Sequence, residues 1–298
     1  AAARCRALTP SDLLARLDDR FRLLRGGRSG VERHQTLRTA LSWSYGLLTE
    51  EERQLFDRLS VFAGGFDLVD AEEVCGFGEI DDADVIDVLA SLVDKSMVVA
   101  DRGGRGVRYR LLETMRQYGE ERLADRAETA ELNDRHLDHF LAVAEQISAQ
   151  DLGPDQLEAL ARFGLQFDNF RAAFSWASTG SDPTPAAELV VALFAPAIDV
   201  LGFEVAEWTD TIREALPDDH PLAPTLLETA FWKIAAGDQD AAMAMARAML
   251  DDDSTRIDQQ ARAWGLMATA YLNSARGPEG LAALHKGLAL LTGPADPA

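Results

Sequence analysis

The sequence contains little cysteine and few aromatic residues, and both shortages narrow the class of protein. Only two of its 298 residues are cysteines, Cys5 and Cys75, which form neither a disulfide framework nor a CxxC metal motif. So few cysteines are typical of proteins in a reducing cytoplasm, and we expect both to be ordinary free thiols. Aromatic residues make up 7% of the chain while Ala and Leu are abundant, a balance that favours helices over a β-sandwich.

Positive charge and long apolar runs are also scarce. The chain has 29 basic and 50 acidic residues and a net charge of −21, which is unsuited to neutralising nucleic-acid phosphates. Its longest apolar stretch, residues 186–203, is interrupted by Glu188, Pro196 and Asp199, which argues against a membrane span. The first residues lack the apolar segment of a secretory signal. We therefore expect a cytoplasmic protein that binds neither membranes nor, directly, DNA.

Motifs for catalysis are missing. Three glycine clusters, at 26–30, 64–65 and 103–106, do not end in GK[ST] and do not lead from a strand into a helix, so they are interpreted as turns. No GxSxG motif or strand-associated Ser/His/Asp arrangement is present. The sequence therefore predicts that the chain is not an enzyme, and it assigns no catalytic, cofactor-binding or metal-binding residues.

A pair of histidines is the one feature that suggests a metal site. His136 and His139 lie three residues apart in a predicted helix, with Asp134 and Asp138 nearby, so that two imidazoles could share one face. No third ligand is signalled, and two apolar residues follow His139 directly. The favoured interpretation is that His139 packs in a partly buried position.

A winged-helix pattern begins after residue 31. Thr49, followed by three glutamates, predicts a helix start, because its hydroxyl can cap the helix and acidic residues complement the helix dipole. Two β-rich runs joined by RGGRG then predict a hairpin with a glycine-supplied turn. The elements expected after the Thr49 helix are helices at about 67–76 and 82–94, strands at 96–101 and 107–112, and a helix at 113–123.

From about residue 127 onward the sequence predicts helices only. Trp232 and Tyr271 recur 39 residues apart, and each precedes a shorter Ala-rich helix, at 238–250 and 279–291. This spacing lies between the period of tetratricopeptide repeats, about 34 residues, and the longer periods of other helical repeats. We therefore predict a degenerate tetratricopeptide-like array in which Trp232 and Tyr271 are core anchors; the plain irregular bundle is the alternative.

The helix at 279–291 has little polar character. Leu281, Leu284, Leu288 and Leu291 form a stripe that one neighbouring helix can cover, and the remaining positions are mostly Ala and Gly. Terminal repeats need a polar outer face, and this helix is a poor cap. We expect the array to continue past residue 298 in a longer parent protein, and the chain to self-associate weakly.

The winged-helix pattern raises the question of DNA binding. The third helix of such a domain can enter a major groove, but residues 82–95 carry four aspartates and one lysine, which phosphates would repel. The wing is more basic, and its arginines suit a docking surface for another protein region equally well. These arginines are Arg102, Arg105, Arg108 and Arg110.

Several stretches carry a resemblance to one family. They are RALTPSDLLARLDDRFRLL (6–24), RHQTLRTALSWSYGLLTEEERQLFDRLSVFAGGFDLVDAEEVC (33–75), VLASLVDKSMVV (88–99), YRLLETMRQYGEERL (109–123) and FDNFRAAFSWA (167–177). They resemble the STAND-class signal-transduction ATPases among AfsR-like and LuxR-type bacterial transcriptional regulators. The resemblance covers about residues 4–177.

The resemblance implies a mainly α fold in three parts: a residual lid helix of the ATPase module (1–30), a winged-helix domain (31–126) and a tetratricopeptide-like array (127–298). The Walker A and Walker B segments are missing from this sequence. ATP or ADP with Mg is therefore expected in the parent protein, and this chain is expected to hold no cofactor.

In related STAND proteins, a Met-His-Asp motif at the end of the winged helix brings a histidine to the nucleotide. The corresponding residues here are Leu111, Leu112 and Glu113. Leu112 cannot donate a hydrogen bond to a phosphate, although Glu113 can still anchor the helix end. In the alternative interpretation, Leu111 and Leu112 pack under the wing.

Two functions remain as hypotheses. The first is a non-catalytic regulatory portion of a STAND ATPase regulator, in which a protein or peptide partner on the array is coupled to the nucleotide switch of the parent's ATPase module. The second is a self-standing winged-helix DNA-binding repressor with a helical ligand-binding domain. The acidic third helix favours the first.

Overall fold

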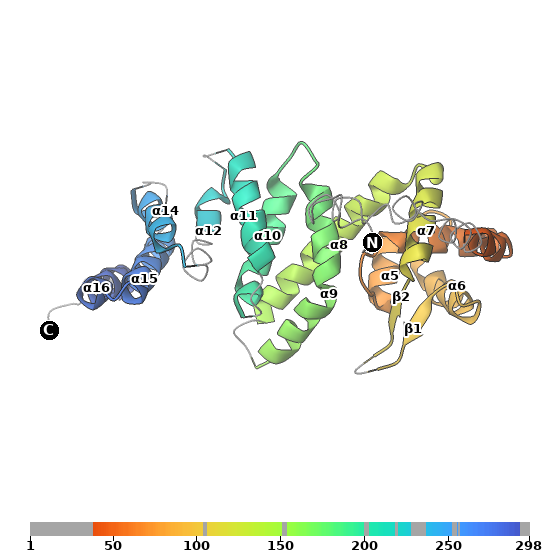
Figure 1. The fold of residues 1–298 in the computed structure, drawn as a ribbon, viewed down its shortest axis with the longest axis horizontal. Coiled ribbons are helices and arrows are strands. Elements are labelled where there is room, and N and C mark those ends of the chain that lie inside the picture. The colour runs from red at the N-terminus through yellow and green to blue at the C-terminus, as the bar shows by residue number, and fades with distance from the viewer. Residues whose placement is uncertain are drawn as a thin grey trace, which may run out of the picture.

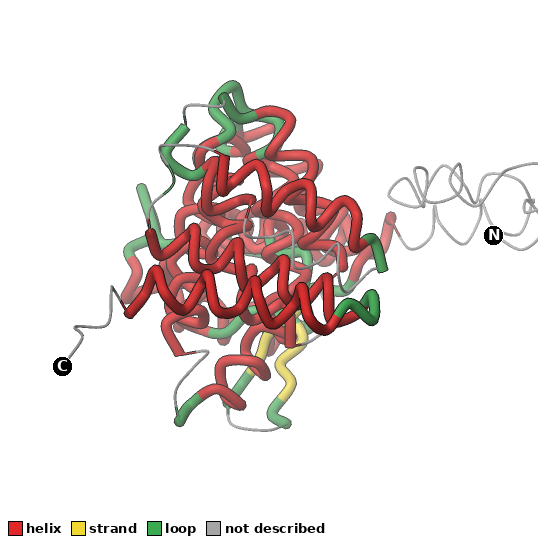
Figure 2. Tube along the Cα trace, turned by 90° about the vertical axis from the view of Figure 1, so that its left-hand side faces the viewer, coloured by secondary structure: helices red, strands yellow, loops and turns green. Residues whose placement is uncertain are grey.

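The structure is a computed structural model that describes residues 38–103, 106–150, 154–199, 203–217, 220–227, 237–251, 255 and 257–292. It is mainly helical, as the sequence predicted, with one antiparallel hairpin near the winged-helix end (Figure 1). Seen along the long axis, the helices are layered and the hairpin lies at one edge (Figure 2). The lid helix expected at 1–30 lies outside the described residues, as do Cys5, Arg105 and Trp232.

The winged-helix elements begin where capping residues place them. Thr49 starts α4 with a capping box, in which its hydroxyl accepts from the Glu52 amide and the Glu52 carboxylate accepts from the Thr49 amide. Asp67 and Asp70 form a second such box at α5. After a helical segment at 38–46, the elements are α4 (Glu50–Arg58), η2 (Leu59–Val61), α5 (Leu68–Cys75), α6 (Asp82–Asp94), β1 (Val99–Asp101), β2 (Arg108–Arg110) and α7 (Glu113–Arg126).

The two strands are shorter than the predicted 96–101 and 107–112. The amides of Met97 and Val98 donate to the Leu92 carbonyl, so these residues close the end of α6 instead of pairing with β2. At the other end, Leu112 is already the N-cap of α7. The pairing that remains joins Val99 to Arg110 and Asp101 to Arg108. Both strands are therefore shorter than the β-rich runs of the sequence, because the ends of the neighbouring helices use the backbone groups at the ends of those runs.

A buried arginine ties the winged helix together. The Arg58 side chain is 1% exposed, and its Nη1 donates to the carbonyls of Cys75 and Phe77 at 2.9 and 2.8 Å. Its Nε lies 2.9 Å from a Glu128 carboxylate oxygen, and its guanidinium stacks 3.5 Å from the Phe77 ring centroid. One side chain thus joins α4, the turn after α5 and the start of the array.

Cys75 is fully buried, and burial raises the pKa of its thiol to about 12, which agrees with an ordinary thiol.

Helices alone follow the winged helix in the described residues, and they succeed one another along the molecule (Figure 1). The predicted helices at 238–250 and 279–291 correspond to α14 and α16. The elements are α8 (Thr129–Gln150), α9 (Gln156–Ala177), α10 (Thr184–Asp199), α11 (Phe203–Ala215), α12 (Ala223–Leu227), α14 (Gln239–Asp251), α15 (Ile257–Asn273) and α16 (Gly277–Thr292).

The apolar core crosses the boundary between the winged helix and the array. Buried apolar residues from Leu41 to Leu226 form one contiguous cluster. Helices α14, α15 and α16 have two smaller clusters of their own, built largely from Ala and Met. Tyr271 is half-buried and packs against both of these, in line with its predicted packing role. The winged helix and the first array helices therefore share one packed interior.

Candidate functional site

The winged helix and the array meet in an aromatic cluster. Phe62 and Phe66, from the segment before α5, stack with ring centroids 4.5 Å apart. Phe140 on α8 meets Phe62 edge-on at 6.2 Å, and Phe170 on α9 meets Phe140 edge-on at 5.9 Å. All four rings are buried, so the junction is a packed interior and not a loose contact.

Buried polar side chains fasten the same junction. Asn169 on α9 donates through Nδ2 to the Gly65 carbonyl at 3.0 Å, and its Oδ1 accepts from the Gly64 amide at 3.3 Å. Gln166, one turn earlier, donates through Nε2 to an Asp70 carboxylate oxygen at 2.9 Å. Asn169 also donates to Gln166 Oε1 at 3.1 Å. Asp70, Gln166 and Asn169 are 0–2% exposed. The buried Gln166–Asp70 bond fixes the position of α5 on α9, and the Asn169 bonds fix the turn before α5 on the same helix.

The wing joins this polar network through one of its arginines. Arg108 donates through Nη2 to the Gly65 carbonyl at 2.5 Å and to Gln166 Oε1 at 3.2 Å. The turn leaves little room for a larger residue, since a Cβ on Gly64 would lie 3.1 Å from Asp168 Cβ and one on Gly65 would lie 3.3 Å from the Tyr109 carbonyl. Arg108 is therefore a docking residue for another region of the protein, one of the two predictions left open for the wing. Arg102 and Arg110 are exposed.

Asp70 is the charged centre of the network. Its Oδ2 accepts from the Asp67 amide and from Gln166, and its Oδ1 lies 2.8 Å from His139 Nε2. Burial pushes the pKa of Asp70 upward, but the hydrogen bonds from His139, the Asp67 amide and Gln166 outweigh burial and hold it below its usual value. Asp70 is therefore ionised at neutral pH.

The two histidines have structural roles. His139 bonds to Asp70, and its side chain is only 12% exposed, which agrees with the predicted partly buried position. His136 lies 4.5 Å from Phe140 and 5.7 Å from Phe62, between ring centroids. Burial, with a contribution from neighbouring His139, lowers the pKa of His136 to about 3, so it is neutral at physiological pH. Within the described residues no group of three His, Cys, Asp or Glu side chains is placed to hold a metal.

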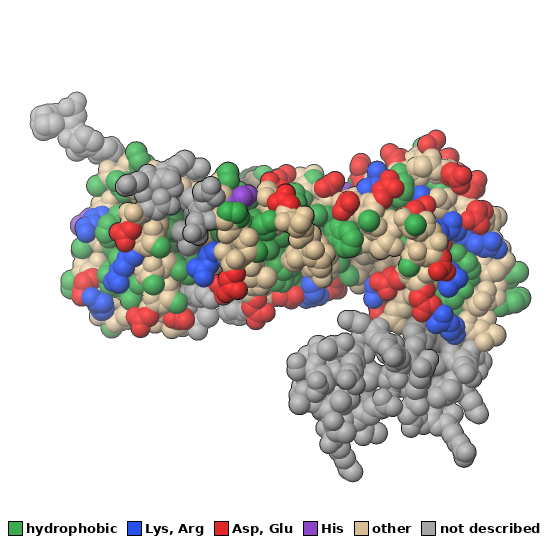
Figure 3. Space-filling model, turned by 90° about the horizontal axis from the view of Figure 1, so that it is seen from above, with side chains coloured by type: hydrophobic (Ala, Val, Ile, Leu, Met, Phe, Trp, Pro, Cys, Tyr) green, Lys and Arg blue, Asp and Glu red, His purple; other side chains and the backbone are tan. Residues whose placement is uncertain are grey.

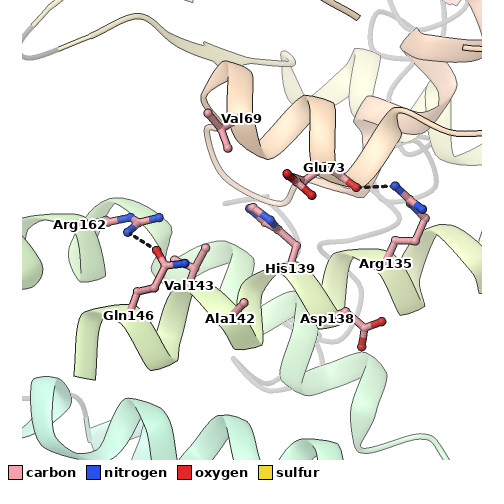
Figure 4. A pocket seen from close by; sticks show the side chains of 9 residues that line it. All are labelled: Val69, Glu73, Arg135, Asp138, His139, Ala142, Val143, Gln146 and Arg162. Carbon is pink, nitrogen blue, oxygen red and sulfur yellow. Dashed lines mark hydrogen bonds between the residues drawn. The ribbon is translucent and has the colours of Figure 1, made fainter. Parts of the chain in front are cut away.

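Above His139, a cleft opens between α5 on one side and α8 and α9 on the other (Figure 4). Its volume is about 520 Å³. Val69, which is 57% exposed, faces it from α5. The other residues that line it are Glu73, Arg135, Asp138, His139, Ala142, Val143, Gln146 and Arg162. The cleft thus lies beside the polar network and contacts both parts of the molecule.

Helix α6 presents an acidic surface. Asp82, Asp84, Asp87 and Asp94 are all exposed. The cation that follows them, Lys95, is held by both carboxylate oxygens of Glu52 at 2.5 and 2.6 Å. On the face drawn in Figure 3, acidic side chains recur along the length of the molecule, interspersed with lysine and arginine. A DNA backbone brought to α6 would meet carboxylates.

The segment between β2 and α7 corrects one interpretation. Leu111 packs against the core as expected, but Leu112 is 42% exposed and does not pack under the wing. The chain turns at Leu112 from the strand into the helix, where it serves as N-cap without a side-chain hydrogen bond. Glu113 accepts hydrogen bonds from Arg116 and Gln117, at 3.1 and 2.9 Å, within the first turn of α7.

The leucine stripe of α16 faces outward, which reverses the expectation that a neighbouring helix covers it. Helix α15 packs instead against small residues, since a Cβ on Gly287 would lie 2.9 Å from the Ala261 carbonyl and Ala283 is 2% exposed. Glycine and alanine allow the two helices to cross closely, and the leucines lie outside the contact between them. Leu281, Leu284, Leu288 and Leu291 are 45–64% exposed.

Comparison with known proteins agrees with this architecture. Residues 48–124 match a family model described as a winged helix-turn-helix domain. Proteins of Mycobacterium tuberculosis and Mycobacterium bovis named "Putative HTH-type transcriptional regulator" are 44% identical to the chain over 194 residues, which is 65% of the chain and 22% of each relative. An "Uncharacterized protein" of M. tuberculosis is 41% identical over 142 residues, 47% of the chain and 36% of the relative.

These likenesses support a family of transcriptional regulators. The chain spans about a fifth of the length of the regulators it matches. No solved structure matches it. Among the described helices, none combines the length and the apolar character that crossing a bilayer requires.

Sequence reasoning missed the residues that fasten the junction. Asp70, Gln166 and Asn169 were not singled out, although a signal was present in α9. Gln166 and Asn169 are polar residues on the same helix face as Phe163 and Phe170, which are buried. A polar residue on a buried helix face needs a specific partner.

Replacing Asp70 by asparagine is expected to lower the free energy of unfolding at neutral pH by about 1–3 kcal/mol, since the amide cannot accept all three hydrogen bonds. The lowered pKa means that the folded state binds fewer protons than the unfolded state, so this stabilisation is present above pH ~4 and is lost as pH falls further. Urea unfolding between neutral and acidic pH should show the two proteins converging. Asp138→Asn, an exposed change on α8, is the control, and a difference that does not depend on pH would contradict the assignment.

The exposed leucine stripe should make the chain self-associate. At about 0.15 M salt the Debye length is roughly 8 Å, so the net negative charge is largely screened and apolar contact can dominate. Sedimentation over a range of protein concentrations should show a rising average mass. Leu284→Glu with Leu291→Glu should abolish the rise, and Ala289→Glu, exposed on the same helix but off the stripe, should keep it. A strict monomer at high concentration would show that the stripe is not a contact surface.

Proposed function

We propose that this chain is a non-catalytic regulatory portion of a transcriptional regulator, which couples a protein or peptide partner on the helical array to a nucleotide switch elsewhere in a longer parent. The observation that carries the proposal is the buried attachment of the wing and α5 to α9 through Asn169, Gln166 and Arg108. A displacement of the array helices would be transmitted to the winged helix, because the turn at Gly64 and Gly65, the wing and α5 are all hydrogen-bonded to α9.

The finer assignment follows the resemblance to STAND ATPases. In this proposal residues 1–30 are the remaining lid helix, 31–126 the winged helix and 127–298 a tetratricopeptide-like sensor array. ATP or ADP with Mg would bind the parent's ATPase module, and this chain in the cytoplasm would hold neither. Exposed Leu112 occupies the place where relatives of that class carry a nucleotide-contacting histidine, so contact there would be apolar.

A winged-helix DNA-binding repressor is the second candidate. The domain match at 48–124 and the names of the mycobacterial relatives favour it. The exposed aspartates of α6 and the inward engagement of Arg108 argue against DNA binding by this domain. In the regulatory proposal, contact with DNA would be made by another part of the parent.

We predict that the chain does not retard duplex DNA in a gel shift at about 50 mM salt, where electrostatic binding is strong. A mixture of sequences should be used, because backbone contacts do not depend on sequence. A variant with Asp82, Asp84 and Asp87 replaced by asparagine serves as the control, since it should bind more strongly if phosphates approach α6. Retardation of the unaltered chain that weakens with added salt would support the repressor instead.

A further inference from the structure

We propose that the cleft between α5, α8 and α9 binds a short peptide with free termini, about three residues long. This deepens the proposed regulatory function by naming a ligand and its site. The cleft has the volume of a small-molecule pocket, about 520 Å³, and its exposed apolar side chains are Val69 and Ala142. Val69 in particular is 57% exposed at its edge.

Two opposite charges remain available to a ligand in this cleft. Arg135 is committed to backbone carbonyls, including Val74 O at 3.1 Å and Gly76 O at 3.0 Å. The side chain of Asp138 points away from α5 (Figure 4), and His139 is held by Asp70. Only Glu73 and Arg162 are left, and within the described residues neither takes part in an ion pair.

These two charges lie at opposite ends of the cleft. Arg162 donates to Gln146 at 3.0 Å, whereas the Glu73 carboxylate lies over His139 (Figure 4). His139 and Gln146 are seven residues apart on α8, about 10 Å at 1.5 Å per residue. An extended peptide advances about 3.3–3.6 Å per residue, so about three residues span this distance.

The polarity of the ligand follows from these charges. A free carboxylate would pair with the Arg162 guanidinium, and a free ammonium would pair with Glu73. Small or aliphatic side chains would lie on the exposed side chains of Val69 and Ala142. A single amino acid carries its two charges on one carbon and cannot reach both ends.

A bound peptide would touch both parts of the molecule. Val69 and Glu73 belong to α5 of the winged helix, and Arg162 belongs to α9 of the array. At the base of the cleft, His139 contacts Asp70 directly. Binding would therefore stabilise the arrangement in which α5 is attached to α9. The size of this effect equals the difference between the peptide's binding free energies for the attached and the detached arrangements.

The test is calorimetric titration of the chain with the tripeptide Ala-Val-Ala at up to millimolar concentration. Blocking either end, as the N-acetyl peptide or the C-terminal amide, should weaken binding about two- to fivefold, because one ion pair with a solvent-accessible charge is lost. Free alanine should bind more weakly than the tripeptide. A flat titration, or equal binding of the doubly blocked peptide, would overturn the proposal.

Matched variants identify which end binds where. In Arg162→Gln the amide should bind as well as the free acid, and in Glu73→Gln the acetylated peptide should bind as well as the free amine. Arg247→Gln, an exposed arginine on α14, should leave every affinity unchanged. The assigned orientation would be refuted if one variant lost both the preference for the free carboxylate and the preference for the free amine. It would also be refuted if both variants kept both preferences. Failure here would leave the regulatory proposal standing, because the DNA experiment tests that proposal separately.

Discussion

The attachment of the turn at Gly64 and Gly65 to α9 by Asn169 is the interaction on which the rest of the structure depends. A buried amide is costly unless its donors and acceptor are satisfied, and Asn169 satisfies both at the backbone of that turn. Displacement by one helical turn would leave Asn169 and Gln166 buried without partners. The apolar rings around them supply burial, but the polar groups determine which relative position is allowed.

This attachment also affects what the winged helix can do. It takes Arg108, an otherwise available cation of the wing, into an internal contact with Gly65 and Gln166. Phe66 and Tyr109 exchange backbone hydrogen bonds at 2.9 and 2.7 Å. The second wing strand is therefore fixed by its backbone as well as by the Arg108 side chain. With aspartates exposed along α6, this face of the domain offers a DNA backbone carboxylates and not cations. Its fold is shared with DNA-binding proteins, but fold alone does not determine function.

Local features of the structure could be predicted from the sequence. The Thr49 cap, the order of the winged-helix elements and the helical character after residue 127 follow from short-range patterns of capping, periodicity and glycine. The strand ends could not be predicted as reliably, since Met97 and Val98 bond to the preceding helix. The same applies to Leu112, whose exposure is set by a change of chain direction.

Contacts between distant segments were beyond such reasoning. Asp70 and Gln166 are separated by 96 residues, and no single-sequence pattern pairs them. The side of α16 that meets α15 was also misjudged. A leucine stripe normally marks the buried face of a helix. Here Gly280, Ala283 and Gly287 allow a closer helix crossing, so α16 packs this small-residue face against α15 and leaves its leucines exposed.

Hydrogen exchange in α5 and α9 tests the central claim most directly, because amides that open together report the same free energy of opening. We expect similar opening free energies for α5 and α9 in the unaltered chain. Asn169→Leu should lower protection in α5 more than in α10, and Asn273→Leu, exposed on α15, should change neither. If α5 keeps its full protection in Asn169→Leu, the winged helix is held on α9 by other contacts and does not depend on Asn169.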